Sequence, residues 1–105
     1  MNLSDKKVAI LGCGRSGVGA AHLALACGAA RVCIFDINPA ATCSDAALEC
    51  VAGATEDQAR EYAADLVVIS PGIEADIPWV LAFAEAGAPI IGECRSKKLT
   101  ITQSY

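Results

Sequence analysis

The sequence has few aromatic residues, a single histidine among its 105 residues and no long apolar run. A transmembrane helix needs about 20 apolar residues, and a secretory signal peptide has a positively charged start followed by an apolar core. Neither pattern is present, so we expect a cytoplasmic protein that does not contact a membrane.

Basic residues are also scarce, because 8 Lys and Arg stand against 12 Asp and Glu and the formal net charge is −4. No basic run is longer than that of Lys97–Lys98, which is too short for the positive surface that nucleic acids require. We therefore expect no nucleic-acid partner.

Six cysteines are many for this length, but none forms a C-x-x-C pair. With one histidine available, the spacing gives little support to a zinc site, and we predict no metal. Most of the cysteines lie in apolar surroundings, which is typical of buried, reduced thiols. Cys13 differs because it lies near a predicted helix N-terminus, where a thiolate is favoured, but we expect it to be a spacer residue.

A glycine motif follows the first apolar run. Val8–Leu11 is unbroken and apolar, which favours a strand buried on both faces of a parallel sheet. The G-x-G-x-x-G of Gly12, Gly14 and Gly17 then leads into a helix predicted over Arg15–Cys27. The three glycines permit a tight turn, a close ligand approach and close helix packing, in that order. The helix N-terminus favours a phosphate, and the alternative is a tight turn without a ligand.

The predicted first helix carries Val18, Ala21 and Leu25 on one face at three- and four-residue spacing. We expect Gly28 to end it in a left-handed conformation and His22 to be a partly buried structural residue.

The second predicted strand is Arg31–Phe35, and it ends at Asp36. Asp36 follows Gly17 by 19 residues (36 − 17), close to the spacing of about 20 expected for a carboxylate that receives a ribose hydroxyl. The alternative is a turn acid at a strand end. Ile37 and Asn38 continue this loop at the carboxyl end of the strand, where open α/β sheets bind ligands.

The middle of the sequence carries no predicted site. We expect a short helix over Ser44–Cys50, a short strand or loop over Val51–Gly53, and a charged surface helix over Glu56–Tyr62.

A second apolar strand, Leu66–Ile69, stops at Ser70, Pro71 and Gly72. Proline removes a backbone donor, and glycine lets the backbone come close to a ligand. We expect this end to lie beside the first glycine loop. The next helix is predicted to run to about Ala86, with Trp79 and Phe83 packed in the core.

These elements predict a single α/β domain, a Rossmann-like doubly wound parallel sheet of about five strands. The fifth strand is Pro89–Ile91, which ends in Gly92 and Glu93, and Lys98–Thr102 is either a sixth strand or a tail. The domain should span residues 1–94, with residues 95–105 a tail or the start of a missing ATP-binding domain.

Three segments together resemble the N-terminal domain of the Mur ligases, and most of all the D-glutamate-adding, MurD-type members. They are Val8–Gly17 (VAILGCGRSG), Ala64–Ile73 (ADLVVISPGI) and Ala86–Glu93 (AGAPIIGE). The resemblance covers about residues 5–94. The first motif is common to many dinucleotide-binding folds, whereas the second and third at this spacing are far more specific.

The resemblance implies that the domain binds the UDP end of UDP-N-acetylmuramoyl-L-alanine, the small-molecule UDP-sugar substrate of a ligase in peptidoglycan synthesis. Carried over by position, Arg15, Ser16 and the backbone of Gly72 would meet the pyrophosphate. Asp36, Ile37 and Asn38 would face the uracil and its ribose. The UDP-binding set implied is Gly14, Arg15, Ser16, Gly17, Asp36, Ile37, Asn38, Ser70, Pro71 and Gly72.

The sequence departs from the family at its end. The family's ATP loop, of the type G-x-x-G-K-[ST], should follow the Gly92–Glu93 region, but Gln103–Tyr105 stands there instead. We expect a substrate-binding domain with no catalytic residue of its own. ATP, Mg²⁺, the central and C-terminal domains, and the choice of the amino acid that is added would belong to the parent enzyme.

Two other functions fit parts of the pattern. The glycine motif and Asp36 suit an NAD(P)-binding Rossmann module of a dehydrogenase equally well. A non-catalytic regulatory domain that has kept the fold is the third reading.

Overall fold

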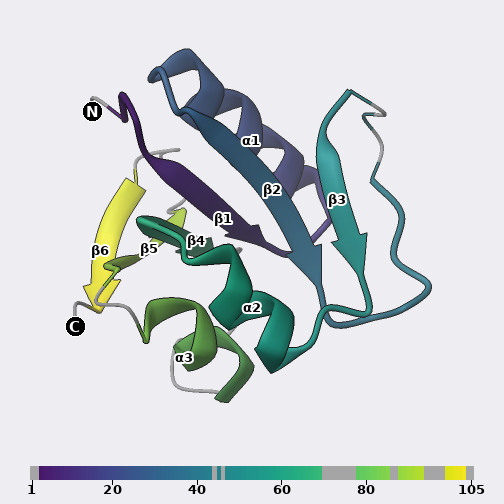
Figure 1. The fold of residues 1–105 in the computed structure, drawn as a ribbon. Coiled ribbons are helices and arrows are strands. Elements are labelled where there is room, and N and C mark those ends of the chain that lie inside the picture. The colour runs from purple at the N-terminus through teal and green to yellow at the C-terminus, as the bar shows by residue number, and fades with distance from the viewer. Residues whose placement is uncertain are drawn as a thin grey trace.

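The computed structural model describes residues 3–43, 45, 47–69, 78–85, 88–93 and 99–103, and the side chains of these residues except at positions 15, 16, 92, 93 and 99–103. These residues form one twisted sheet with helices on both of its faces (Figure 1). In chain order the elements are β1 (Lys7–Leu11), α1 (Arg15–Ala26), β2 (Arg31–Asp36), β3 (Glu49–Ala52), α2 (Glu56–Tyr62), β4 (Leu66–Ile69), α3 (Pro78–Ala84), β5 (Ile90–Glu93) and β6 (Leu99–Gln103).

The strands lie in the order β3-β2-β1-β4-β5-β6. The five strands from β3 to β5 are parallel to their neighbours, and β6 runs antiparallel to β5. The predicted parallel α/β sheet is therefore confirmed, and the segment predicted as a strand or a tail is a strand. The division at residue 94 stays a prediction, although β6 lies beyond it.

Strand β1 is apolar throughout because both of its faces are covered. Val8 and Ile10 point to the face packed by α1, and Ala9 and Leu11 point to the face packed by α2 and α3. All four side chains are fully buried. A strand with one solvated face would alternate between apolar and polar residues, so the run Val8–Leu11 correctly indicates a doubly covered strand.

Helix α1 packs on the sheet through small side chains. Ala20, Ala21 and Ala24 are buried, whereas Leu25 is 46% exposed. The predicted face is therefore wrong at Leu25, because the buried stripe of α1 consists of Gly17, Ala20, Ala21 and Ala24, and Leu25 lies beside it. His22 is also exposed rather than partly buried, and its Nε2 lies 2.9 Å from the Asp45 carboxylate.

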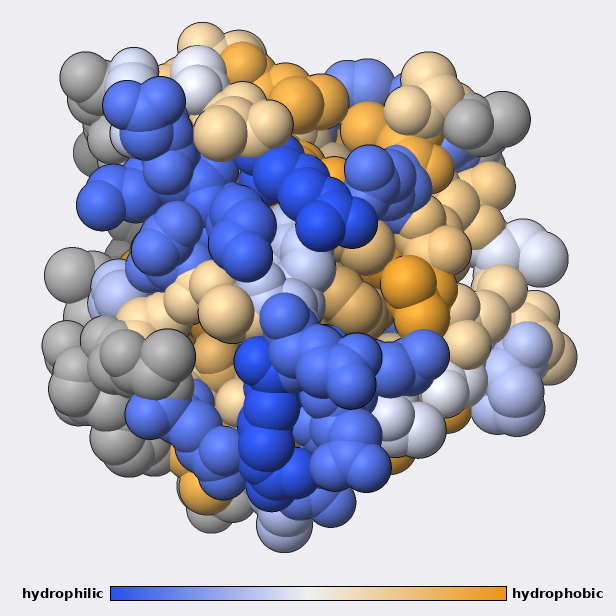
Figure 2. All heavy atoms as spheres, viewed as in Figure 1, coloured by the Kyte–Doolittle hydropathy of each residue, from blue (hydrophilic) through white to orange (hydrophobic). Residues whose placement is uncertain are grey.

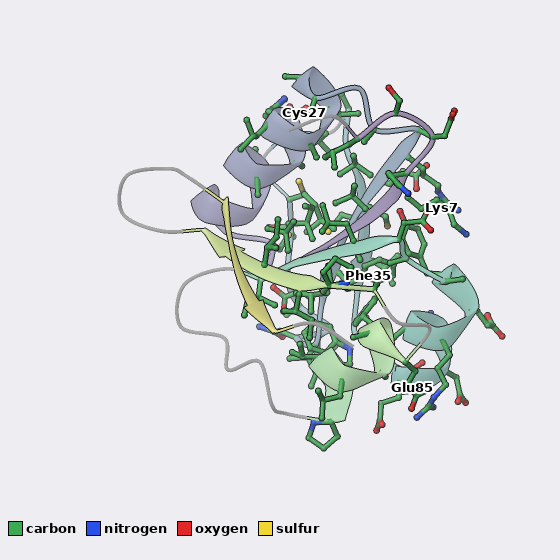
Figure 3. The ribbon with its side chains drawn as sticks, turned by 90° about the vertical axis from the view of Figure 1, so that its left-hand side faces the viewer. Lys7, Cys27, Phe35 and Glu85 are labelled. Atoms are coloured by element: carbon green, nitrogen blue, oxygen red, sulfur yellow. The ribbon has the colours of Figure 1, made fainter. Side chains whose placement is uncertain are left out.

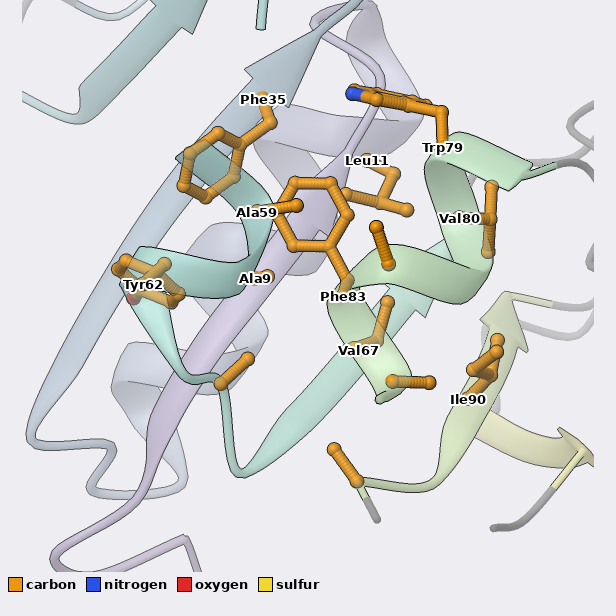
Figure 4. Close-up of a cluster of buried hydrophobic side chains, with 14 of the residues drawn as sticks. Ala9, Leu11, Phe35, Ala59, Tyr62, Val67, Trp79, Val80, Phe83 and Ile90 are labelled. Atoms are coloured by element: carbon orange, nitrogen blue, oxygen red, sulfur yellow. The ribbon is translucent and has the colours of Figure 1, made fainter. Parts of the chain in front are cut away.

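The opposite face holds an aromatic cluster (Figure 4). Phe35 contacts the rings of Tyr62 and Phe83 at centroid distances of 5.1 and 4.8 Å, and Trp79 stands edge-on to Phe83 at 5.5 Å. The Tyr62 hydroxyl donates to the Val8 carbonyl at 2.8 Å, and burial raises the pKa of this phenol. The predicted core role of Trp79 and Phe83 is confirmed.

Helix α2 begins with a complete capping box. The Thr55 hydroxyl accepts from the Gln58 amide, and the Gln58 side chain accepts from the Thr55 amide. Its outer surface is charged, and hydrophilic side chains gather over α2 in Figure 2. Arg60 forms an ion pair at 2.7 Å with Glu85, the residue that follows α3, and Figure 3 shows Glu85 beside α2 and α3. The predicted surface helix is confirmed.

The helix predicted over Ser44–Cys50 is wrong, because Glu49 and Cys50 belong to strand β3. The Asp45 carboxylate accepts a hydrogen bond from the Ala47 amide at 2.9 Å. Such a local bond offers the backbone an alternative to a helix. The pairing of β3 with β2, in which Glu49 lies opposite Cys33, then holds Glu49 and Cys50 in an extended conformation.

The other boundaries follow the predictions closely. Helix α1 ends at Ala26, and Gly28 has the expected positive φ of 89°. Helix α3 ends at Ala84, two residues before its predicted end at Ala86, which itself lies outside the described residues.

Gly17 allows α1 to approach the end of β1. A Cβ atom built on Gly17 would overlap with the carbonyl oxygen of Gly12, whereas a Cβ atom on Gly19 would meet nothing within 4 Å. The third glycine of the motif therefore serves helix–strand packing, as the sequence predicts.

Gly17→Ala should lower the free energy of unfolding by at least about 2 kcal/mol, because the added methyl group forces the helix and loop apart. Gly19→Ala is the matched control in the same helix and should raise it by up to about 1 kcal/mol. Urea unfolding followed by circular dichroism measures both. Equal effects of the two substitutions would contradict the packing role of Gly17.

Candidate functional site

The glycine motif forms an open turn at the carboxyl end of β1. Gly12 has a φ of 107°, a conformation that L side chains rarely adopt, and its amide donates to the Phe35 carbonyl at 2.8 Å. Gly14 is exposed, and a Cβ atom built on it would meet nothing within 4 Å. The turn therefore leaves free space next to the backbone at Gly14, where the sequence predicts that a ligand approaches.

The N-terminus of α1 has no side-chain cap. Its N-cap residue is Gly14, which has no side chain that could accept from the first-turn amides, and no acidic residue lies in the first turn. Helix α2 differs, since Thr55 and Gln58 satisfy its first turn. Uncapped first-turn N–H groups and the positive end of the helix dipole form a ready site for an anion.

Arg15 and Ser16 form the first turn of α1, so their backbone lies where the sequence predicts phosphate contacts. Nothing is described of their side chains. Gly17 is buried against the turn. Because glycine has no side chain, only its backbone amide can contribute to ligand binding.

Asp36 links the glycine turn to the loop after β2. Its Oδ2 accepts from the Cys13 amide at 3.1 Å, and its Oδ1 accepts from the Asn38 amide at 2.9 Å. Its own carbonyl accepts from the Ala54 amide at 2.9 Å. The half-buried carboxylate therefore fixes two loops that the sequence predicts to face one ligand, a role that the spacing alone does not reveal.

Ile37 and Asn38 extend from this point toward solvent. Ile37 is 61% exposed, so its side chain is accessible to a ligand at this end of the sheet. The Asn38 side-chain oxygen accepts from the Ala40 amide at 2.9 Å, so part of its hydrogen-bonding capacity stabilises the turn. Both residues lie on the same edge of the sheet as the glycine turn.

The end of β4 lies beside the end of β1, as predicted, because Leu11 pairs with Ile69 in the parallel register. Ser70, Pro71 and Gly72 follow directly in the sequence and lie outside the described residues. The structure thus places the end of β4 beside the glycine turn. Contacts of Ser70, Pro71 and Gly72 with a ligand stay a prediction.

Cys13 is a buried thiol rather than a thiolate. Its side chain is 6% exposed, and its Sγ lies 3.3 Å from the Sγ of Cys50. Burial, followed by the contact with Cys50, raises the pKa of Cys13 to about 12. Burial therefore outweighs the nearby helix N-terminus. No pattern in the sequence indicates that Cys50 is the neighbour of Cys13.

The other surface features do not form a comparable site. A hollow of about 250 Å³ lies between α2 and α3 and is bordered by the Arg60–Glu85 ion pair. Within the described ranges, no group of three or more His, Cys, Asp or Glu side chains is arranged to hold a metal ion. In the same part of the chain, no helix combines the length and apolar character needed to cross a bilayer.

Asp36→Ala should remove two charge-assisted hydrogen bonds and lower the free energy of unfolding by about 2 kcal/mol. Asp65→Ala is the control, because Asp65 accepts from the Lys7 amide at the opposite end of β1. Amide hydrogen exchange should show faster exchange at Cys13 and Asn38 only in the Asp36 variant. Unchanged protection of both amides would rule out the bridging role.

Comparison with known proteins adds independent information. Residues 6–92 match the family model described as "Mur ligase MurD-like, N-terminal domain". Among the curated relatives, UDP-N-acetylmuramoylalanine–D-glutamate ligase of Lachnospira eligens is 38% identical over 100 residues, and the match covers 89% of this chain and 22% of that protein. The enzyme of the same name from Limosilactobacillus fermentum is 39% identical over 93 residues, which cover 84% of this chain and 20% of that protein.

A third relative, the ligase of the same name from Acidobacterium capsulatum, is 33% identical over 117 aligned positions, covering 99% of this chain and 25% of that protein. The chain thus spans between a fifth and a quarter of the length of these relatives. The family model covers most of the sequence, including β1 to β5 up to Gly92. The chain therefore belongs to the Mur ligase family and corresponds to its MurD-like N-terminal domain.

Proposed function

We propose that this chain binds the UDP portion of UDP-N-acetylmuramoyl-L-alanine for a ligase that adds D-glutamate to that substrate. The observation that carries the proposal is the uncapped N-terminus of α1, open at Gly14 and joined to the Asp36 loop by a 3.1 Å hydrogen bond. An anion site and a carboxylate side by side suit a ligand that has a pyrophosphate at one end and hydrogen-bond donors at the other.

The pyrophosphate would lie over the glycine turn. Backbone amides from Gly14 to Gly17 would donate to its oxygens, and the dipole of α1 would stabilise its negative charge. The Ser16 hydroxyl and the Arg15 guanidinium would add hydrogen bonds, those from Arg15 being charge-assisted. This arrangement needs no side chain at Gly14.

The uridine would lie over the loop after β2. The Asp36 carboxylate keeps acceptor capacity after receiving two backbone amides, because two carboxylate oxygens offer about four lone-pair sites. It can therefore accept from a ribose hydroxyl or from a uracil N–H. The exposed Ile37 side chain would cover a face of the base, and Asn38 would contact its edge.

Ser70, Pro71 and Gly72 would complete the site from the neighbouring strand end, with the Gly72 backbone on the pyrophosphate. We assign no catalytic residue to this chain. In the proposed parent enzyme another domain would hold ATP and Mg²⁺. ATP would phosphorylate the alanyl carboxylate with release of ADP, and D-glutamate would attack the resulting acyl phosphate and displace phosphate. That enzyme would act in the cytoplasm together with its central and C-terminal domains.

A calorimetric titration with UDP and, separately, with NAD tests this proposal. We expect a heat of binding with UDP and none with NAD, because the proposed site is specific for the uridine portion of its ligand. Binding of NAD without UDP would instead support a dinucleotide-binding module. The absence of binding by either nucleotide would favour a regulatory domain that has lost its ligand.

Gly14→Val should abolish UDP binding without unfolding the domain, since the valine side chain would fill the space over the turn. Gly14 has a φ of −74°, which any L residue adopts, so backbone strain does not interfere with the test. Gly19→Val adds the same side chain to the same helix away from the turn and should bind UDP as the unmodified chain does. Full affinity in the Gly14 variant would contradict the assignment of the turn.

A further inference from the structure

Two thiols meet beneath the glycine turn. Cys13 lies in the turn between Gly12 and Gly14, and Cys50 lies in β3, opposite Ile34 of β2. Their sulfur atoms are 3.3 Å apart, although the residues are 37 positions apart in the sequence. Strand β2 lies between β1 and β3 in the sheet, and the two cysteines meet on the face of the sheet that α1 covers, in the same cluster as Ile34 of β2.

The other described cysteines are placed differently. Cys27 follows the last residue of α1 (Figure 3), at the end opposite to the glycine turn, and a helix of this length measures about 18 Å. Cys33 packs in the core cluster on the opposite face of the sheet. Cys43 packs against the same cluster as Cys13 and Cys50, but its sulfur donates to the Asp45 carbonyl at 3.4 Å.

We propose that Cys13 and Cys50 are a redox-active pair that a hydroperoxide converts to an intramolecular disulfide. The bond would link the glycine turn covalently to β3. A disulfide has a sulfur–sulfur distance of about 2.0 Å, so the two sulfurs need to approach by little more than 1 Å. The pair is therefore a modification site next to the proposed nucleotide site.

The chemistry begins at Cys50, which is half-buried, whereas Cys13 is buried. The Cys50 sulfur attacks one oxygen of hydrogen peroxide, the O–O bond breaks, and Cys50 sulfenic acid and water form. The Cys13 sulfur then attacks the Cys50 sulfur, the S–O bond breaks, and the Cys13 proton leaves with the hydroxyl group as a second water. The two sulfurs together lose two electrons, which the two peroxide oxygens gain.

The order of these steps agrees with the environment of each thiol. Burial raises the pKa of Cys13 to about 12, so this thiol stays protonated at neutral pH and reacts poorly with an oxidant from solution. Cys13 instead contributes proximity, because its sulfur already touches the one that is oxidised. An accessible cysteine poised next to a resolving cysteine is typical of redox-sensitive pairs.

The bond should change nucleotide binding, an effect that rests on the proposed function. Movement of Cys13 toward β3 strains the hydrogen bond from its amide to Asp36, at present 3.1 Å long, and shifts Gly14 with it. We expect UDP to bind about tenfold more weakly to the oxidised chain, the equivalent of one lost hydrogen bond. Reduction with dithiothreitol should restore the affinity.

Peptide mapping after treatment with hydrogen peroxide tests the pair directly. Trypsin cleaves after Lys7, Arg15, Arg31 and Arg60, so Cys13 is released in residues 8–15 and Cys50 in residues 32–60. The two peptides should appear linked, and lighter by two hydrogen atoms than their sum. Because Cys33 and Cys43 share the second peptide, Cys50→Ser should abolish the link and Cys43→Ser should retain it.

The outcomes separate the two proposals. Failure of the unmodified chain to form the link, or a link that persists in the Cys50→Ser variant, overturns the redox pair whatever binds at the turn. A specific link in a chain that binds no UDP when reduced overturns the proposed function and leaves the pair intact. A specific link with unchanged UDP affinity overturns the effect of the pair on the glycine turn.

Discussion

The contact between Gly17 and the carbonyl group of Gly12 is the constraint on which the rest of the site depends. Because no Cβ atom fits between them, α1 begins directly over the end of β1 and its first-turn amides face the space above the sheet. The same close approach agrees with the small side chains that α1 buries against the sheet at Ala20, Ala21 and Ala24. Asp36 can then hold the turn through the Cys13 amide. A larger residue at position 17 would separate the helix from the strand and disperse all of these groups.

Much of the fold could be predicted because the signals are local. The apolar runs Val8–Leu11 and Leu66–Ile69 identify strands covered on both faces. The charged segment Glu56–Tyr62 forms the helix that it predicts, with Thr55 as its N-cap. The glycine motif predicts the turn after β1, because the reasons for a glycine at each of its three positions involve only residues close in the sequence. Parallel pairing also predicts that the carboxyl ends of β1 and β4 lie together, and Ile69 is indeed next to Leu11.

The missed features depend on contacts between distant segments. The prediction of a helix over Ser44–Cys50 is wrong because the pairing of Glu49 with Cys33 determines the conformation at Glu49. Local helix propensity contains no information about that pairing. The neighbour of Cys13 is missed for a similar reason, since the helix N-terminus is visible in the sequence and burial beside Cys50 is not. His22 is exposed because α1 packs on the sheet through the small residues near it in the sequence, and His22 lies outside that packed face. In each case tertiary packing outweighed a local preference.

The charges around the turn also determine how the proposed ligand would lie. A pyrophosphate placed against Asp36 would bring like charges together, whereas over the first turn of α1 it meets N–H donors and a positive dipole end. The uridine is neutral and carries hydroxyl and N–H donors, so it gains hydrogen bonds from the same carboxylate that repels the phosphates. The hydrogen bond between Asp36 and Cys13 fixes these two environments side by side. The orientation, with phosphates on the helix and the nucleoside on the loop after β2, therefore follows from charge separation within one small site.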